Sequence, residues 1–268
     1  MPPIDPRLRL PGPRPWILAH RGASDREPEN TLAAFRRALD DGADLIETDL
    51  WWSADGELVC HHDATARRMT GDPRRIDQLR VAQLQALRVR APRAGRGAAA
   101  TVGTIPTLAE LFALVGERVP LVLELKDPRF RARAWAERFA AAVGPRAAAG
   151  RVAVIAFDRR ALAAVRAAAP GLICGHVSLG SPVPRPGTEL LGPFAPLLRL
   201  HPGYVAAAHR QGQIVCPLDP QLHRNLGRWL ALDVDAVLTN EPAGTRRAIA
   251  ALRAARGEPL AAGLRAPP

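Results

Sequence analysis

The 268-residue sequence has few cysteines, few aromatic side chains and almost no lysine. Its three cysteines are odd in number, widely spaced and without a paired metal motif, which fits a reduced cytoplasm better than a disulfide scaffold. Residues 1–15 contain no apolar run of signal-peptide length, and no long apolar helix, lipidation signal or amphipathic basic helix is evident. We therefore expect a cytoplasmic protein without stable membrane insertion.

The low aromatic content also bears on the charge of the chain. A formal charge of +11 would suit a protein that binds nucleic acid or an anionic membrane through arginine. The arginines are scattered, however, aromatic residues make up only 4% of the chain, and no nucleic-acid module is recognisable. Biased codon usage with a solvated basic surface explains the charge more simply. We expect no nucleic-acid partner, and a basic nucleic-acid-binding or non-catalytic barrel stays as an alternative.

Among the 37 lysine and arginine residues, Lys126 is the single lysine. Arginine can evidently fill the other cationic positions, so position 126 is expected to need a compact ammonium group. Survival of one lysine by chance at a strand end is the alternative. The neighbouring Glu124 favours a functional role.

What the sequence does have is an ordered series of polar motifs in residues 20–63. They supply imidazoles for proton transfer, a guanidinium that can grip a phosphate, and carboxylates one residue apart on a predicted strand. Alternate residues of a strand share a face, so the two carboxylates of the third motif point the same way. Phosphate-cleaving chemistry is the interpretation that uses all four motifs: His20-Arg21-Gly22, Pro28-Glu29-Asn30, Glu47-Thr48-Asp49 and His61-His62-Asp63.

Apolar runs that alternate with helical patterns predict an α/β protein, a TIM (β/α)8 barrel in one domain over residues 1–256. Residues 51–107 form a small insertion after the second strand, with a flexible basic stretch at 91–103. Residues 181–196 are expected to be a loop and 257–268 a flexible C-terminal tail. The eight predicted strands are 16–20, 45–50, 120–126, 151–157, 172–176, 197–201, 213–218 and 235–239.

Three of these strands end in charged groups. The first ends at His20, the second carries Glu47 and Asp49, and the third carries Glu124 and Lys126. Parallel α/β folds place their active sites at the carboxyl edge of the strands. We therefore expect these groups to converge at one end of the barrel.

Some members of the motifs have plainer interpretations. His61 faces away from His62 on an extended segment, so we expect it to pack or meet solvent. Asn30 is expected to cap a helix over residues 31–41, with Glu29 near the site. Trp51 and Trp52 are expected to pack, although they could also wall a pocket.

The order and spacing of these motifs resemble the glycerophosphodiester phosphodiesterase family. The resemblance covers residues 16 to about 250. Besides the motifs of residues 20–63, the segments that carry it are Gly42, Asp55-Gly56, Ile105-Pro106-Thr107-Leu108, Leu123-Glu124-Leu125-Lys126 and the stretch from Val234 to Pro242.

The resemblance implies a role for each motif residue. Glu47, Asp49 and Glu124 would bind one divalent cation, His20 and His62 would be the acid and base, and Arg21 and Lys126 would hold phosphate oxygens. A hard site of three carboxylates suits Mg²⁺ or Ca²⁺ better than zinc. The implied reaction converts a small-molecule glycerophosphodiester to an alcohol and glycerol 3-phosphate. The first nucleophile could be water, or the glycerol hydroxyl through a cyclic phosphate.

The second half departs from the family pattern. Ala156 stands where the family commonly has serine, and Cys216-Pro217 stands where it usually has tryptophan and threonine. The second change removes an aromatic wall from the expected pocket, so the substrate can differ. A phospholipase D-like barrel acting on lysophospholipids or another phosphodiester is therefore an alternative. The sequence carries no signal for oligomeric state.

Overall fold

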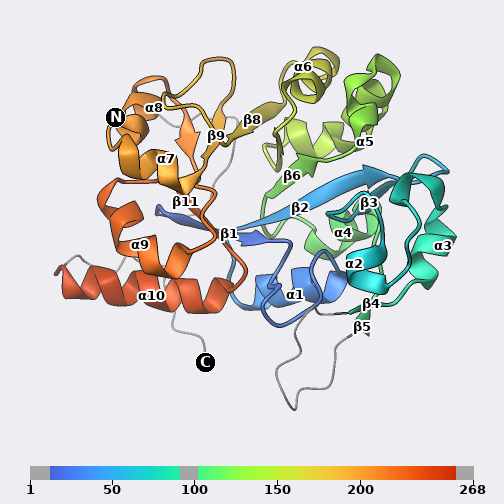
Figure 1. The fold of residues 1–268 in the computed structure, drawn as a ribbon, viewed down its shortest axis with the longest axis horizontal. Coiled ribbons are helices and arrows are strands. Elements are labelled where there is room, and N and C mark those ends of the chain that lie inside the picture. Colours follow the sequence, from blue (N-terminus) through green and yellow to red (C-terminus); the bar gives the residue numbers. More distant parts are fainter. Residues whose placement is uncertain (1–12, 91–101, 258–268) are drawn as a thin grey trace.

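The computed structural model describes residues 13–90 and 102–257, and it shows a nearly closed barrel of eight parallel strands surrounded by helices (Figure 1). The predicted fold class is confirmed. The barrel strands in chain order are β1 Trp16–His20, β2 Leu45–Trp52, β6 Leu121–Leu125, β7 Val152–Ala156, β8 Ile173–Ser178, β9 Leu190–Pro193, β10 Ile214–Val215 and β11 Ala236–Thr239.

Seven parallel pairings follow chain order around the barrel, with β1 between β2 and β11. The remaining seam, between β10 and β11, is joined by Asp235. Its backbone N–H donates to the Val215 carbonyl at 3.0 Å, and its carboxylate accepts from the Val215 N–H at 2.8 Å. A carboxylate thus replaces part of a backbone ladder where two short strands meet.

Helices follow the strands and cover them from outside. Figure 1 shows α5 and α6 on one side of the strands and α9 and α10 on the opposite side. Their apolar faces pack on the sheet in two groups, one around Phe35 and Phe139 and one around Trp229. The helices are α1 Leu32–Asp40, α4 Leu108–Val115, α5 Arg133–Ala148, α6 Arg159–Ala168, α7 Ala195–Leu200, α8 Tyr204–Arg210, α9 Leu222–Ala231 and α10 Pro242–Ala255.

The insertion after β2 forms a small layer beside the barrel, on the right of Figure 1. Its own apolar core includes Trp51, Met69, Ile76 and Leu84. A capping box between Thr107 and the N–H of Glu110 begins α4, where the chain returns to the barrel. The insertion contains β3 Leu58–Cys60, α2 Arg67–Thr70, a 3-10 turn at Ile76–Gln78, α3 Val81–Ala86, β4 Val89–Arg90 and β5 Val102–Gly103.

The alternation of side chains along each strand separates the inside of the barrel from the outside. On β2, Ile46 and Leu50 pack outward against the helices, whereas Leu45 and Glu47 face the hollow interior. The strand is therefore buried along its whole length, yet it still presents polar groups to a cavity.

The prediction of the sixth strand was wrong. Residues 197–201 lie mostly in α7, which ends at Leu200, and the sixth barrel strand is β9. This strand lies inside the stretch 181–196 that was expected to be a loop. It pairs with β8, in a register that sets Leu190 beside Gly175. A Cβ at Gly175 would lie 2.7 Å from the Leu190 Cβ, so this close approach of strands requires glycine.

Parts of two predictions lie outside the described residues. These are the flexible stretch at 91–103, of which only β5 is described, and the tail from 258 onward. Within the described ranges, no helix has the length and apolarity that crossing a bilayer requires.

Candidate active site

Three carboxylates converge at the carboxyl edge of the barrel. Glu47 and Asp49 lie on β2, and the parallel register sets Glu124 of β6 directly beside Asp49. One oxygen from each of the three lies within 4.8 Å of the others. All three side chains are buried. Their convergence agrees with the prediction from strand spacing.

Two cations lie against these carboxylates. Lys126 Nζ is 2.8 Å from Glu124 Oε1 and 3.3 Å from Asp49 Oδ1. Arg21 Nε is 3.1 Å from Asp49 Oδ2, and the Arg21 backbone N–H donates to Glu47 Oε2 at 3.1 Å. Three buried negative charges therefore face two positive ones, which leaves the cluster short of one positive charge or one proton.

That imbalance appears in the pKa values. Burial, and then the charges of Asp49 and Glu124, raise the pKa of Glu47 well above its ordinary value. Burial also acts to raise the pKa of Asp49, but Arg21 and Lys126 outweigh it and hold that pKa below the ordinary value. Burial also raises the pKa of Glu124, so without a further cation the charged forms of Glu47 and Glu124 are both disfavoured.

The atoms of the cluster fit a divalent cation. Glu47 Oε1 is buried and accepts no hydrogen bond from any described residue. A buried acceptor without a donor is costly, and a bound ion removes that cost. The donor set consists of carboxylate oxygens, the ligands that hard divalent cations prefer. Glu47, Asp49 and Glu124 could therefore hold such an ion.

The loop after β1 is shaped to bring Arg21 to the cluster. Arg21 has a left-handed backbone with φ 60°, and Gly22 follows with φ 83°. A Cβ at Gly22 would lie 2.5 Å from the backbone carbon of Ala34, so only glycine fits between this loop and α1. The His-Arg-Gly motif thus contains a side chain that points at the carboxylates and a glycine that permits the turn.

Two histidines lie at the same edge. His20 Nδ1 is 2.8 Å from the amide oxygen of Asn240, and His62 Nδ1 is 2.7 Å from Asp63 Oδ1. Both oxygens are acceptors, so Nδ1 carries the proton in each ring and Nε2 is the free basic atom of the neutral form. Burial, followed by Arg21, lowers the pKa of His20 to about 4. Burial is also the largest cause that lowers the pKa of His62.

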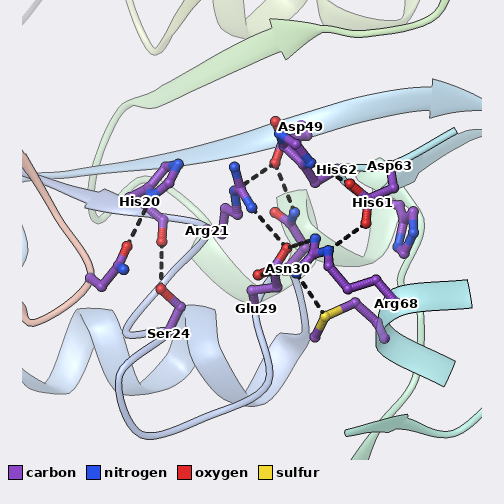
Figure 2. Close-up of polar contacts among 12 residues, drawn as sticks. His20, Arg21, Ser24, Glu29, Asn30, Asp49, His61, His62, Asp63 and Arg68 are labelled. Atoms are coloured by element: carbon purple, nitrogen blue, oxygen red, sulfur yellow. Dashed lines mark hydrogen bonds and ion pairs between the residues drawn. The ribbon is translucent and has the colours of Figure 1, made fainter. Parts of the chain in front are cut away.

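Asn30 does not cap α1, contrary to the sequence prediction. Thr31 is the cap, and its hydroxyl accepts from the Ala34 N–H at 3.2 Å. Asn30 has φ 57°, and its amide donates to Asp49 Oδ2 at 2.9 Å while accepting from the Thr48 hydroxyl at 2.8 Å. Figure 2 shows this amide pointing at Asp49.

Arg68 of the insertion is a site residue that sequence reasoning missed. Figure 2 shows its guanidinium between two acids: it contacts Asp63 Oδ2 at 2.5 Å and Glu29 Oε1 at 2.6 Å. Glu29 in turn pairs with Arg21 at 2.9 Å. A chain of polar contacts thereby links His62 to Arg21 through Asp63, Arg68 and Glu29. Glu29 lies near the site as predicted, and no motif of the sequence indicated Arg68.

His61 is buried, and its Nε2 is 3.1 Å from the backbone oxygen of Thr65. Figure 2 shows its ring turned away from His62. This agrees with the packing role expected from its position.

A hollow of about 260 Å³ runs from this edge into the barrel, and the cluster lies on its wall. The rest of the lining is mostly apolar and comes from β7 to β11 and from the earlier residues of β1, β2 and β6. Phe157 lies at the rim, where Lys126 Nζ is 5.8 Å from the ring centroid. The sequence predicted that the pocket lacks an aromatic wall at Cys216. Ile214 and Cys216 line that side of the hollow. The cavity therefore joins a charged half to an apolar half.

Comparison with known proteins agrees with this arrangement. The model of the glycerophosphoryl diester phosphodiesterase family matches residues 20–243. The chain belongs to this family. A glycerophosphodiester phosphodiesterase of Caldanaerobacter subterraneus is 30% identical over 233 residues, which cover 84% of this chain and 94% of that protein. One from Bacillus altitudinis is 28% identical, with coverage of 84% and 94%.

The fold is shared as well. A crystal structure from Silicibacter pomeroyi superposes with a TM-score of 0.76 and 26% identity, covering 90% of this chain and 96% of that chain. The chain is therefore an enzyme of the phosphoric diester hydrolase class, and the family's first-half motifs lie at the carboxyl edge of its barrel.

Proposed function

We propose that the protein hydrolyses glycerophosphodiesters to an alcohol and glycerol 3-phosphate in a reaction that depends on a divalent cation. The observation that carries the proposal is the buried oxygen of Glu47, which has no hydrogen-bond donor among the described residues, beside Asp49 and Glu124. The known substrate class of the family supports the reaction.

The cation in this proposal is Mg²⁺ or Ca²⁺, held by Glu47, Asp49 and Glu124, because oxygen-only sites favour these ions. Bound there, it supplies Lewis-acid stabilisation of charge on the phosphoryl oxygens. Lys126 and Arg21 lie against the same carboxylates, so both can hold phosphate oxygens while they neutralise the cluster.

His20 and His62 are the proposed acid and base. Each ring is fixed through Nδ1, which presents Nε2 for proton transfer. One imidazole takes the proton of the nucleophile, either water or a glycerol hydroxyl, and the other gives a proton to the leaving alcohol. A cyclic phosphate that accumulates before glycerol 3-phosphate in quenched reactions would identify the hydroxyl route.

A solved structure with the same fold contains the product that we propose. A phosphodiesterase from Oleispira antarctica was crystallised with its product sn-glycerol 3-phosphate, and its fold matches with a TM-score of 0.71. Its identity to this chain is 23%, so the likeness shows the shared fold alone. The product named for that protein is the one we propose here.

The decisive experiment measures alcohol release from choline, ethanolamine, glycerol and inositol glycerophosphodiesters. It is run with Mg²⁺, with Ca²⁺ and with a chelator, and calorimetry measures binding of each ion directly. Glu47→Gln keeps the size of the side chain but removes a charged ligand, so we expect it to lose both ion binding and turnover. Equal turnover in chelator and in Glu47→Gln would contradict the metal-dependent reaction.

The apolar half of the hollow favours one second candidate, hydrolysis of a lysophospholipid. Phe157 at the rim is 43% exposed, and Leu179 and Val183 after β8 are each 60% exposed. Phe157 lines the hollow, and exposed apolar residues on the loop after β8 are suited to an acyl chain. If the substrate is a lysophospholipid, turnover depends on the acyl chain. Leu179→Asp then lowers kcat/KM for the acylated substrate alone. Equal turnover of choline esters with and without the chain would exclude it.

Three further expectations belong to this proposal. We propose that residues 1–256 act as one barrel domain, that the substrate is the small-molecule partner, and that the enzyme works in the cytoplasm. Gel filtration would give the oligomeric state, for which neither sequence nor structure supplies a signal.

A further inference from the structure

A second hollow, of about 180 Å³, lies outside the barrel between β8 and α6, beneath residues 185–188. It is separate from the barrel interior because β8 lies between the two. Val177 of this strand lines the barrel hollow, whereas the preceding residue, His176, lines the outer one. Figure 1 shows α6 beside β8 at the top of the molecule.

The outer hollow concentrates positive charge. Arg159, Arg166 and Arg185 all line it. Arg166 is neutralised by Glu189, to which it donates two hydrogen bonds at 3.0 and 2.6 Å. Arg185 donates to the Ser181 hydroxyl at 3.1 Å, and neither it nor Arg159 forms an ion pair with a carboxylate in residues 13–90 and 102–257. Two guanidinium groups, both on exposed residues and without a carboxylate partner in these ranges, therefore border a cavity of a few water volumes.

His176 lines the same hollow and brings no negative charge to it. The side chain is partly buried and lines the hollow together with Arg159 and Arg185. Burial, then Arg159 and Arg185, lower its pKa, so the ring is neutral at pH 7. A neutral ring thus lines a hollow whose other ionisable side chains are arginines.

We propose that this outer hollow binds a small oxyanion, a phosphate or a phosphate monoester, between Arg159 and Arg185. Like charges that converge repel each other unless an anion bridges them, and guanidinium groups match phosphate oxygens with paired donors. The volume is below the roughly 300 Å³ at which pockets for drug-sized ligands begin, so the ligand is a compact anion.

The test follows the ring of His176 by NMR during titration with inorganic phosphate, and separately with glycerol 3-phosphate to distinguish the free ion from a monoester. Loss of one signal in His176→Gln assigns the resonance. A bound anion favours the charged imidazole, so we expect phosphate to raise the pKa of His176 by about 1 unit. The same rise is expected in Lys126→Met, which alters the barrel site and leaves the outer hollow intact.

Two variants make the result specific. Arg159→Gln with Arg185→Gln should abolish the shift, whereas Arg160→Gln, an exposed neighbour on α6 that does not line the hollow, should keep it. A His176 resonance that does not respond to millimolar phosphate or glycerol 3-phosphate would overturn the proposal. So would a shift that persists in the double variant, since the anion would then bind elsewhere.

Discussion

The side-chain amide of Asn30 donates a hydrogen bond to Oδ2 of Asp49 at 2.9 Å, from a backbone in the left-handed region. The same amide accepts from Thr48, so its orientation is fixed from both ends. Asp49 is thereby held in place by a residue from a loop after another strand. A carboxylate orientated in this way has fewer conformations to lose when it binds an ion.

Asn30→Gly tests this relationship without backbone strain, because glycine adopts a positive φ freely. We expect it to lower divalent-ion affinity, measured by calorimetry, by about 10- to 100-fold. Thr70→Ser, which keeps a hydroxyl in the insertion away from the carboxylates, serves as control and should bind normally. An unchanged affinity in Asn30→Gly would show that Asp49 needs no such support.

Lys126→Arg keeps the charge but replaces a compact ammonium with a planar fork. Nζ lies between Glu124 and Asp49 at 2.8 and 3.3 Å, a space that a guanidinium does not fill in the same way. We expect kcat/KM to fall by about 10²-fold or more. The matched control is Arg133→Lys, which exchanges the same residue types in an exposed surface pair. Equal activity of Lys126→Arg would assign the lone lysine to chance.

The stability of the protein should fall as the pH is lowered from 6.5 towards 4. His20 has an ordinary pKa of 6.5 and a folded pKa of about 4, so in this window the unfolded chain binds a proton that the folded protein does not. The free energy of unfolding therefore rises with pH across the window.

Urea denaturation at several pH values, with a chelator present throughout, measures this slope. His20→Asn should make it shallower, and the part that remains belongs to the other groups, among them His62, whose pKa is also lowered. A slope identical in His20→Asn and the parent protein would show that His20 takes up its proton equally in both states.

Asp235→Ala should destabilise the barrel at its seam. Asp235 is fully buried, and its carboxylate accepts from the Val215 N–H and from His209 Nε2, each at 2.8 Å. Its removal leaves a buried N–H and the Arg14 guanidinium without this partner, for which we expect a loss of about 3 kcal/mol in the free energy of unfolding.

Glu137→Ala is the control for that measurement, because it removes a carboxylate from an exposed pair with Arg133 on α5. Its effect should stay within about 0.5 kcal/mol. If the two variants unfold at the same denaturant concentration, the seam does not depend on Asp235.

The cluster of carboxylates could be predicted because it depends only on strand periodicity and on the meeting of parallel strands at one edge. The positions of Glu47, Asp49 and Glu124 could be predicted without knowing how distant loops fold. The roles of Asn30 and Arg68 could not, because both depend on the conformation of such loops. Asparagine and threonine both cap helices well, so the pair Asn30-Thr31 leaves the capping residue ambiguous. The contact of Arg68 with Glu29 depends on how the insertion folds over the site.

The sixth strand was misplaced for a local reason. Residues 197–200 contain three leucines and Arg199, which resembles a short strand, but Pro196 lies in the first turn of α7, where proline favours a helix start. The true strand, Leu190–Pro193, has four residues, of which one is glycine and one proline. Its pairing with β8, rather than its own propensity, makes it a strand. Pro196 was the residue in the sequence that indicated a helix start here.

The single lysine has a practical consequence for enzymologists who work with this chain. A protease that cleaves only after lysine has one target, the bond between Lys126 and Asp127, and that side chain is 17% exposed at the end of a central strand. Cutting the native protein requires the barrel mouth to open locally. The rate of cleavage thus measures that opening at one defined bond, and any ligand that favours the closed mouth will slow it.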